Sequence, residues 1–191
     1  MVLGEGANRR IYWLGGATET GVLSDVATYD PATDAWGVGP ALPAARTYVS
    51  ALTYNGRAYV LGGINQANAA VNEVLVSTHD ASGTLTGWQT AATLDNAPWS
   101  SVAFVLETSA GVPYLFLAGG GSGQTVSRNV LRAPIHADGS LGAFVDSGTD
   151  MPSAIQRASA VVHDHRVYVL GGKDQVRNLS TNQVFIGALE E

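Results

Sequence analysis

The sequence of 191 residues contains no cysteine, only one lysine and no long hydrophobic run. Without cysteine the chain has no disulfide bond, thiolate metal site or cysteine nucleophile. Acidic residues outnumber Lys173 and the nine arginines, and a net charge of −6 does not favour binding to nucleic acid or to anionic lipid. Glycine or a polar residue interrupts each apolar stretch before the roughly 18 residues that a membrane span requires. We therefore expect a soluble protein with neither a nucleic acid nor a membrane partner, in a compartment that the sequence leaves open.

What the sequence does contain is a repeated unit marked by pairs of glycine. Each pair follows a run rich in β-branched and aromatic residues, as in RVYVLGG at 166–172. The second glycines, at positions 16, 63, 120 and 172, are 47, 57 and 52 residues apart, which indicates a repeat architecture with a period of about 50 residues. The four pairs are Gly15 and Gly16, Gly62 and Gly63, Gly119 and Gly120, and Gly171 and Gly172.

Other positions coincide when the four copies are aligned on these glycines. An aromatic residue stands three positions before the first glycine of every pair: Tyr12, Tyr59, Phe116 and Tyr168. Another aromatic residue opens a later run in three copies: Trp36, Trp88 and Phe144. Each copy is therefore predicted to form four short antiparallel strands. The glycines would end the second strand, where only a residue without Cβ tolerates a positive φ and a close backbone approach. Such sheets stack around an axis as propeller blades, because each sheet then covers its neighbour.

These features resemble the kelch-repeat β-propellers, whose hallmark is a double glycine followed by a tyrosine and a tryptophan with six residues between them. The first copy fits with Tyr29 and Trp36, whereas the second and third copies lack the tyrosine. The resemblance implies an all-β fold of four kelch-type blades, each a four-stranded antiparallel sheet, incomplete at both termini. We expect a single propeller or propeller fragment across 1–191, with blade repeats at approximately 1–43, 44–98, 99–152 and 153–191.

The ends of the chain interrupt the pattern. The first copy has little more than a stub of its first strand around Val2 and Leu3, and the fourth copy lacks a fourth strand. Three explanations are open. The chain is a piece of a larger parent of six or seven blades, which we favour, or it closes as a small four-bladed ring. In the third explanation it is a homo-oligomer whose second copy completes the blades, since unpaired sheet edges promote association.

No catalytic constellation stands out in the sequence. His163, Asp164 and His165 align with a polar turn of the second copy, and we interpret them as a turn because a metal site needs three or four ligands. The GGGSGQ segment at 119–124 lacks the lysine and the helix of a phosphate-binding loop. We therefore expect no catalytic residue, no metal and no cofactor.

Ligand binding is expected on loops at one end of the propeller axis, because the strands are committed to the core. Trp99 is the strongest candidate, since an exposed aromatic on a turn is a common platform for a sugar ring or a protein partner. Arg46 and Arg157, which both follow a proline, are predicted to make a repeated contact between blades instead. The full set of predicted ligand-binding residues is Trp99, Asn65, Gln66, Asn68, Gln124, Arg128, Lys173 and Arg177.

Two classes of function follow. We favour a non-enzymatic recognition module that binds a protein or a glycan through this loop face. The alternative rests on the resemblance, because some kelch-like propellers are sugar enzymes. A copper radical oxidase is excluded, since its cofactor needs a tyrosine joined to a cysteine. A metal-independent, mutarotase-like enzyme stays open.

Overall fold

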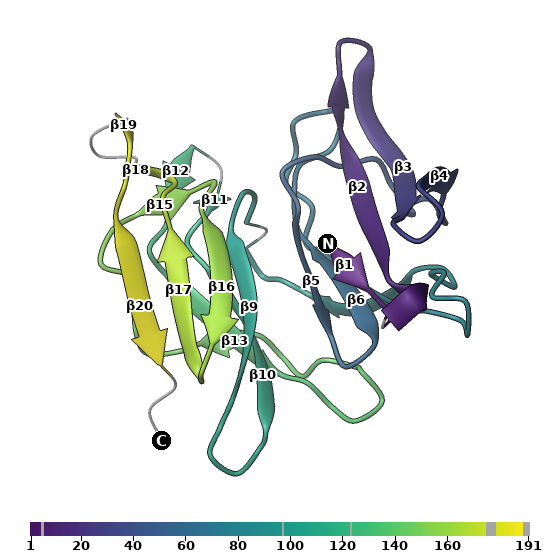
Figure 1. The fold of residues 1–191 in the computed structure, drawn as a ribbon. Coiled ribbons are helices and arrows are strands. Elements are labelled where there is room, and N and C mark those ends of the chain that lie inside the picture. Colours follow the sequence, from purple (N-terminus) through teal and green to yellow (C-terminus); the bar gives the residue numbers. More distant parts are fainter. Residues whose placement is uncertain (5, 97, 123, 175–178, 189–191) are drawn as a thin grey trace.

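The computed structural model describes residues 1–4, 6–96, 98–122, 124–174 and 179–188. The described residues form β-strands and one 3-10 turn, η1 (Gly6–Asn8), which confirms the all-β prediction. Among the described residues, no helix is long and apolar enough to cross a membrane. Figure 1 shows the strands gathered into sheets that stand side by side around a common direction.

Four of the sheets are the blades, and they follow one another along the chain. Blade 1 contains β1 (Val2–Leu3), β2 (Arg10–Thr18), β3 (Gly21–Asp30) and β4 (Ala35–Val38). Blade 2 contains β5 (Ser50–Tyr54), β6 (Arg57–Leu61), β7 (Glu73–Thr78) and β8 (Gln89–Thr93). Blade 3 contains β9 (Val102–Glu107), β10 (Pro113–Ala118), β13 (Val130–Pro134) and β14 (Val145–Asp146). Blade 4 contains β16 (Ser159–His163), β17 (Arg166–Leu170) and β20 (Val184–Ala188).

Two small sheets lie beyond the ends of the blade strands. One pairs β11 (Gly121–Ser122) with β12 (Thr125–Val126), and the other joins β15 (Ile155–Gln156), β18 (Lys173–Asp174) and β19 (Leu179–Ser180). Both are at the upper end of the molecule in Figure 1. This end therefore carries the connections from second to third strands and those from one blade to the next.

Strand pairing places the four copies in one register. The aromatic residue of each second strand faces the same point of the third strand, in the pairs Tyr12 with Thr28, Tyr59 with Val76, Phe116 with Arg132, and Tyr168 with Ile186. The alignment on the glycine pairs is thus confirmed at the level of hydrogen-bonded partners.

The glycine pairs are needed where one blade meets the segment that enters the next blade. A Cβ on Gly15, Gly62 or Gly119 would come within 3.0 Å of a backbone carbonyl oxygen of that segment. The second glycine of each of these three pairs donates its N–H to the same carbonyl, as in Gly120 to Ile155 at 2.9 Å. All eight glycines of the four pairs have positive φ. One detail differs from the prediction: in blade 1 the pair lies inside β2, at a bulge, because the β2–β3 hairpin continues to Thr18.

Three hydrophobic clusters fill the spaces between consecutive blades. Tyr12 and Val26 of blade 1 pack with Ala58, Val60 and Leu75 of blade 2. Further clusters centre on Tyr59, Leu61, Leu115 and Leu117 between blades 2 and 3, and on Phe104, Phe116, Val167 and Val169 between blades 3 and 4. The packing of each sheet on its neighbour, as predicted for propeller blades, therefore accounts for the core.

No such cluster joins blade 4 to blade 1 within the described residues, and each of these blades exposes one face. Trp13 of blade 1 is 70% exposed, although the equivalent residues Val60, Leu117 and Val169 are buried. Trp36, the counterpart of Trp88 and Phe144, is also exposed for the same reason. Figure 1 shows β4 and β20 at opposite sides of the molecule. The blades thus form an open arc and not the closed four-bladed ring considered from the sequence.

Candidate functional site

The three segments that lead into blades 2, 3 and 4 meet at the loop end of the arc. Each forms a backbone bridge to the residue that follows a glycine pair: Thr47 with Ile64, Trp99 with Gly121, and Gln156 with Lys173. Thr47, Trp99 and Gln156 therefore occupy one repeated position, and the same is true of the residues that follow them, Tyr48, Ser100 and Arg157.

Backbone hydrogen bonds join the second set of residues across the blades. Ser100 N–H donates to the Tyr48 carbonyl at 2.8 Å, and Arg157 N–H donates to the Ser100 carbonyl at 2.9 Å. All three residues have a positive φ of 55° to 58°. Non-glycine residues adopt this conformation at a cost and only where the surroundings enforce it, and such residues concentrate at functional sites. The row therefore has one repeated backbone conformation in all three entry segments.

Side chains from these segments form an aromatic–arginine cluster of Tyr48, Trp99 and Arg157. The ring centroids of Tyr48 and Trp99 are 5.9 Å apart at an interplanar angle of 55°. The Arg157 guanidinium carbon lies 5.2 Å from the centroid of the Tyr48 ring, and Tyr48 is 43% exposed. The cluster thus offers solvent two aromatic surfaces, a hydroxyl and a cation, which together suit a ligand with both C–H and polar groups.

Trp99 is less exposed than predicted from the sequence. Its side chain is half-buried, because its indole lies directly over Gly121, where a Cβ would overlap the ring. The backbone bridge between Trp99 and Gly121 holds the two residues in place. Trp99 is therefore a fixed platform and not a mobile loop residue.

Other predicted ligand residues make contacts that shape the loops. The Gln66 Oε1 accepts a 2.6 Å hydrogen bond from Val22 N–H, which ties the β2–β3 tip of blade 1 to a loop of blade 2. Asn65 Oδ1 accepts hydrogen bonds from the N–H groups of Ala67 and Ala69, and Asn68 has a positive φ. These three residues therefore stabilise the conformation of the loops.

Of the remaining predicted residues, those that the structure describes make no hydrogen bond, ion pair or ring contact with the cluster. Gln124 is exposed, and Arg128 forms an exposed 3.1 Å ion pair with Asp150. Lys173 is half-buried in β18. Arg177 lies outside the described residues.

Arg46 and Arg157, in contrast, are not equivalent, and this corrects the sequence alignment. The Arg46 carbonyl accepts a hydrogen bond from Gly16 N–H, and the Ile155 carbonyl accepts the equivalent bond from Gly120 N–H, so the two positions that match are Arg46 and Ile155. Arg46 is fully buried and donates to Glu73 at 2.8 Å, whereas Arg157 is exposed. Arg46 and Ile155 are each the third residue after a proline, whereas Arg157 is the fifth. Tyr48 and Arg157 were missed as site residues for this reason, and their repeated position beside Trp99 is the signal that would have found them.

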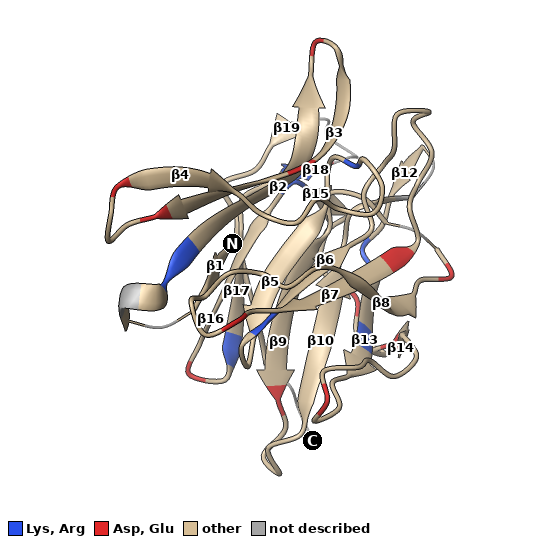
Figure 2. Ribbon diagram, turned by 90° about the vertical axis from the view of Figure 1, so that its right-hand side faces the viewer, with Lys and Arg blue, Asp and Glu red and all other residues tan. Residues whose placement is uncertain are grey.

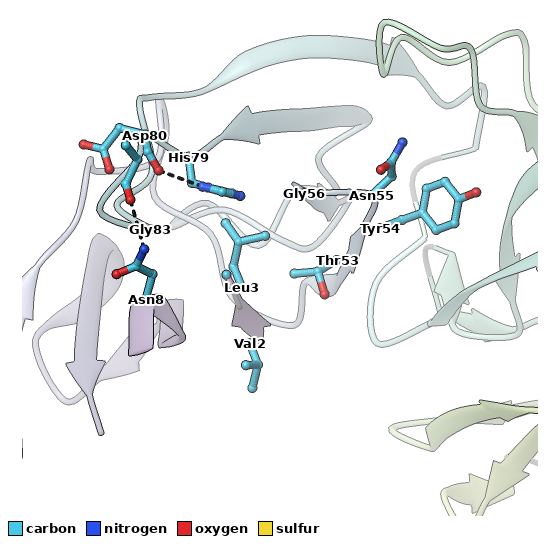
Figure 3. A pocket seen from close by; sticks show the side chains of 12 residues that line it. Val2, Leu3, Asn8, Thr53, Tyr54, Asn55, Gly56, His79, Asp80 and Gly83 are labelled. Atoms are coloured by element: carbon cyan, nitrogen blue, oxygen red, sulfur yellow. Dashed lines mark hydrogen bonds between the residues drawn. The ribbon is translucent and has the colours of Figure 1, made fainter. Parts of the chain in front are cut away.

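A cavity of about 470 Å³ opens between blades 1 and 2, on the side of the blades opposite the aromatic–arginine cluster. In Figure 3 the His79 imidazole extends toward it from one side, and Thr53, Tyr54 and Asn55 line the other. The hydroxyl and N–H of Ser82 and the N–H of Thr84 hydrogen-bond to the Asp80 carboxylate and lower its pKa. This carboxylate therefore stabilises its loop and is not poised for acid–base chemistry. The described residues hold no group of three or more His, Asp or Glu side chains that could bind a metal.

Charge does not mark either end as a site. Figure 2 shows the acidic and basic segments dispersed over separate strands and turns. The aromatic–arginine cluster is therefore distinguished by its geometry and side-chain chemistry.

Comparison with known proteins supports the fold. Neither a protein-family model nor a curated protein matches the sequence. Among solved structures, the chain is similar to YjhT, with a TM-score of 0.70 at 12% identity over 88% of this chain. The chain has the fold of kelch-type β-propeller blades. The chain spans half of the length of YjhT. At 12% identity, the similarity between the two proteins concerns the fold alone.

Proposed function

We propose that this protein is a non-enzymatic recognition module that binds a glycan or a protein through the loop end of its kelch-type blades. The observation that carries the proposal is the aromatic–arginine cluster, in which Tyr48, Trp99 and Arg157 come from three successive blade-entry segments. Their backbone is held by interblade hydrogen bonds, so the side chains are organised before a ligand arrives. Preorganised groups lose little conformational entropy on binding.

A glycan fits these groups better than a flat protein surface does. The tilted rings of Tyr48 and Trp99 form a small platform, of a kind that packs against the C–H face of a sugar ring. Arg157 supplies donors for hydroxyl or carboxylate oxygens beside that platform. The residues that shape the neighbouring loops, among them Gln66, would set the outline of the binding surface.

The test is a glycan array followed by titration of the binding sugars against tryptophan fluorescence. We expect Trp99→Ala to weaken binding by about tenfold or more, because a stacked aromatic contributes roughly 1–3 kcal/mol at a recognition site. Trp36→Ala is the matched control, since Trp36 is an exposed tryptophan on blade 1 and outside the cluster. Equal loss in both variants would contradict the proposal.

Two other outcomes decide between ligand classes. Binding to no glycan, together with capture of a protein partner that Trp99→Ala prevents, would assign the site to protein recognition. Exchange of sugar anomers accelerated by the protein, followed by NMR, would instead indicate a mutarotase-like enzyme and overturn the non-enzymatic proposal.

A further inference from the structure

The cavity between blades 1 and 2 has a shape that contacts between the two blades fix. Blade 1 contributes β1 and the segment that follows it, and blade 2 contributes the β5–β6 turn and the connection from β7 to β8. The Asn8 side-chain amide donates to the Ala81 carbonyl at 3.1 Å, and a Cβ on Gly83 would overlap the Asn8 carbonyl oxygen. Leu3 also lines the cavity and is only 3% exposed, because it packs in the core between these blades. The volume of about 470 Å³ is in the range of small-molecule sites.

The imidazole of His79 is oriented at the wall of this cavity by a hydrogen bond. Its Nδ1 lies 2.8 Å from the backbone carbonyl oxygen of Asp80. A carbonyl oxygen can only accept, so in the neutral ring the hydrogen is on Nδ1 and the lone pair is on Nε2. A Cβ on Gly56 would lie 3.5 Å from Nε2, which has no hydrogen-bond partner within the described chain. Figure 3 shows the ring extended toward the cavity, so His79 presents a free acceptor to a bound molecule.

The other wall carries groups that can both donate and accept hydrogen bonds. Thr53 and Asn55 line it, on β5 and on the turn that follows. Their side chains form no hydrogen bond within the part of the chain that the structure describes. The hydroxyl of Tyr54, in contrast, already donates to the Glu107 carboxylate at 2.7 Å. A free imidazole nitrogen, a hydroxyl and an amide therefore line one space.

The charges around the cavity favour a neutral ligand. No lysine or arginine is among the described lining residues, so a bound anion would have no cation to pair with. The carboxylate of Asp80 accepts hydrogen bonds from Ser82 and from the N–H of Thr84, and it is the only carboxylate among the described lining residues. A bound ammonium group would have to compete with these bonds. Hydroxyl groups, which donate and accept without charge, match the groups that are free.

We propose that this cavity is a second ligand site, which binds a neutral polyhydroxylated molecule of about monosaccharide size. One ligand hydroxyl donates to Nε2 of His79, and neighbouring ligand oxygens exchange hydrogen bonds with the Thr53 hydroxyl and the Asn55 amide. The site is independent of the function proposed for the loop end, because the cavity includes no residue of the aromatic–arginine cluster.

Histidine NMR of the full chain tests the proposal. In ¹⁵N-labelled protein at a pH of about 8, where an ordinary histidine is neutral, the His79 ring should carry its hydrogen on Nδ1 before any sugar is added. Glucose, galactose and mannose are the neutral probes, and glucuronate and 6-amino-6-deoxyglucose are the charged ones. We expect a neutral hexose to shift the Nε2 resonance of His79 and to bind at least about threefold more tightly than either charged probe. A hydrogen on Nε2 in the free protein, no shift with any neutral hexose, or tighter binding of a charged probe would overturn the proposal.

Variants separate this cavity from the fold and from the loop end. Thr53→Val removes the hydroxyl from an exposed strand residue, so it should weaken hexose binding about threefold or more at an unchanged melting temperature. His79→Ala should weaken binding about tenfold. His136→Ala is the matched control, because His136 lies in the third-to-fourth-strand connection of blade 3 and lines another cavity. Equal weakening in the two histidine variants would refute the site. Trp99→Ala should leave the His79 shift unchanged, so failure of this proposal and failure of the loop-end proposal are distinguishable.

Discussion

The hydroxyl of Tyr12 in blade 1 donates a 2.6 Å hydrogen bond to the carbonyl of Gly83 in blade 2, 71 residues further along the chain. The same oxygen accepts a hydrogen bond from the N–H of Leu85. Burial raises the pKa of Tyr12 above its ordinary value, and burial does the same for Tyr59, whose hydroxyl donates to Gly139 in blade 3. The tyrosine of the second strand therefore links each of these blades to the next.

Tyr12→Phe should lower the free energy of unfolding by about 1–2 kcal/mol, because the carbonyl of Gly83 and the N–H of Leu85 lose a buried partner. Urea denaturation measures this change. Tyr168→Phe is the matched control at the equivalent position, where the described structure shows no acceptor for the hydroxyl, and it should be nearly neutral. Equal losses in the two variants would show that the tyrosine contributes through its ring alone.

Gly62→Ala should destabilise the fold by about 3 kcal/mol or more, because the new Cβ would collide with the Pro98 carbonyl oxygen. The alanine would also have to keep the positive φ of the glycine, which is unfavourable for a residue with a Cβ. Gly148→Ala imposes the positive φ without the collision, and we expect a loss of about 1 kcal/mol. Thermal melts of both variants provide the comparison. Similar losses would mean that backbone conformation, and not close approach between blades, requires the glycine pair.

Arg46→Ala should cost about 2–4 kcal/mol, since it leaves a cavity and removes the hydrogen bond to Glu73. Arg46→Met should cost about 1 kcal/mol or less. Arg46 is fully buried, and one of its guanidinium nitrogens has no partner among the described residues, so an apolar side chain of similar length removes an unsatisfied buried donor. Denaturant midpoints would test the order of the two variants, and a methionine variant as unstable as the alanine variant would contradict it.

Stability should fall in alkaline solution through Tyr54. Burial and the hydrogen bond to the Glu107 carboxylate raise the pKa of Tyr54 to about 12. The folded state therefore holds this proton more tightly than the unfolded state, whose tyrosine pKa is near 10. The contribution is complete below pH 10 and is lost as the pH rises from about 10 to 12. Ultraviolet titration of the wild type and of Tyr54→Phe should show that the highest tyrosine pKa disappears in the variant.

Local sequence patterns were sufficient to predict the blades. The glycine pairs, the aromatic three residues before them and the alternation of each strand depend on backbone conformation and on which side chains a sheet buries. These features recur at the same register in every copy. The alignment of Tyr12, Tyr59, Phe116 and Tyr168 was therefore correct without any knowledge of the residues that they contact. The aromatics Trp36, Trp88 and Phe144 were likewise placed at one repeated position, although only a neighbouring blade decides whether that position is buried.

The binding face was harder to predict, because its residues are brought together by contacts between blades. Trp99 was identified from its residue type, but its half-buried setting over Gly121 depends on a bridge between separate segments. Tyr48 and Arg157 were missed, and Arg46 was matched to the wrong partner, since the sequence alone does not show which loop residues share a place around an axis. The sequence thus determined the repeat and the β-strands, which arise from short-range patterns of burial and backbone freedom. Only the tertiary structure decided which loop side chains meet and which blade faces stay open, because those depend on packing between residues about 50 positions apart.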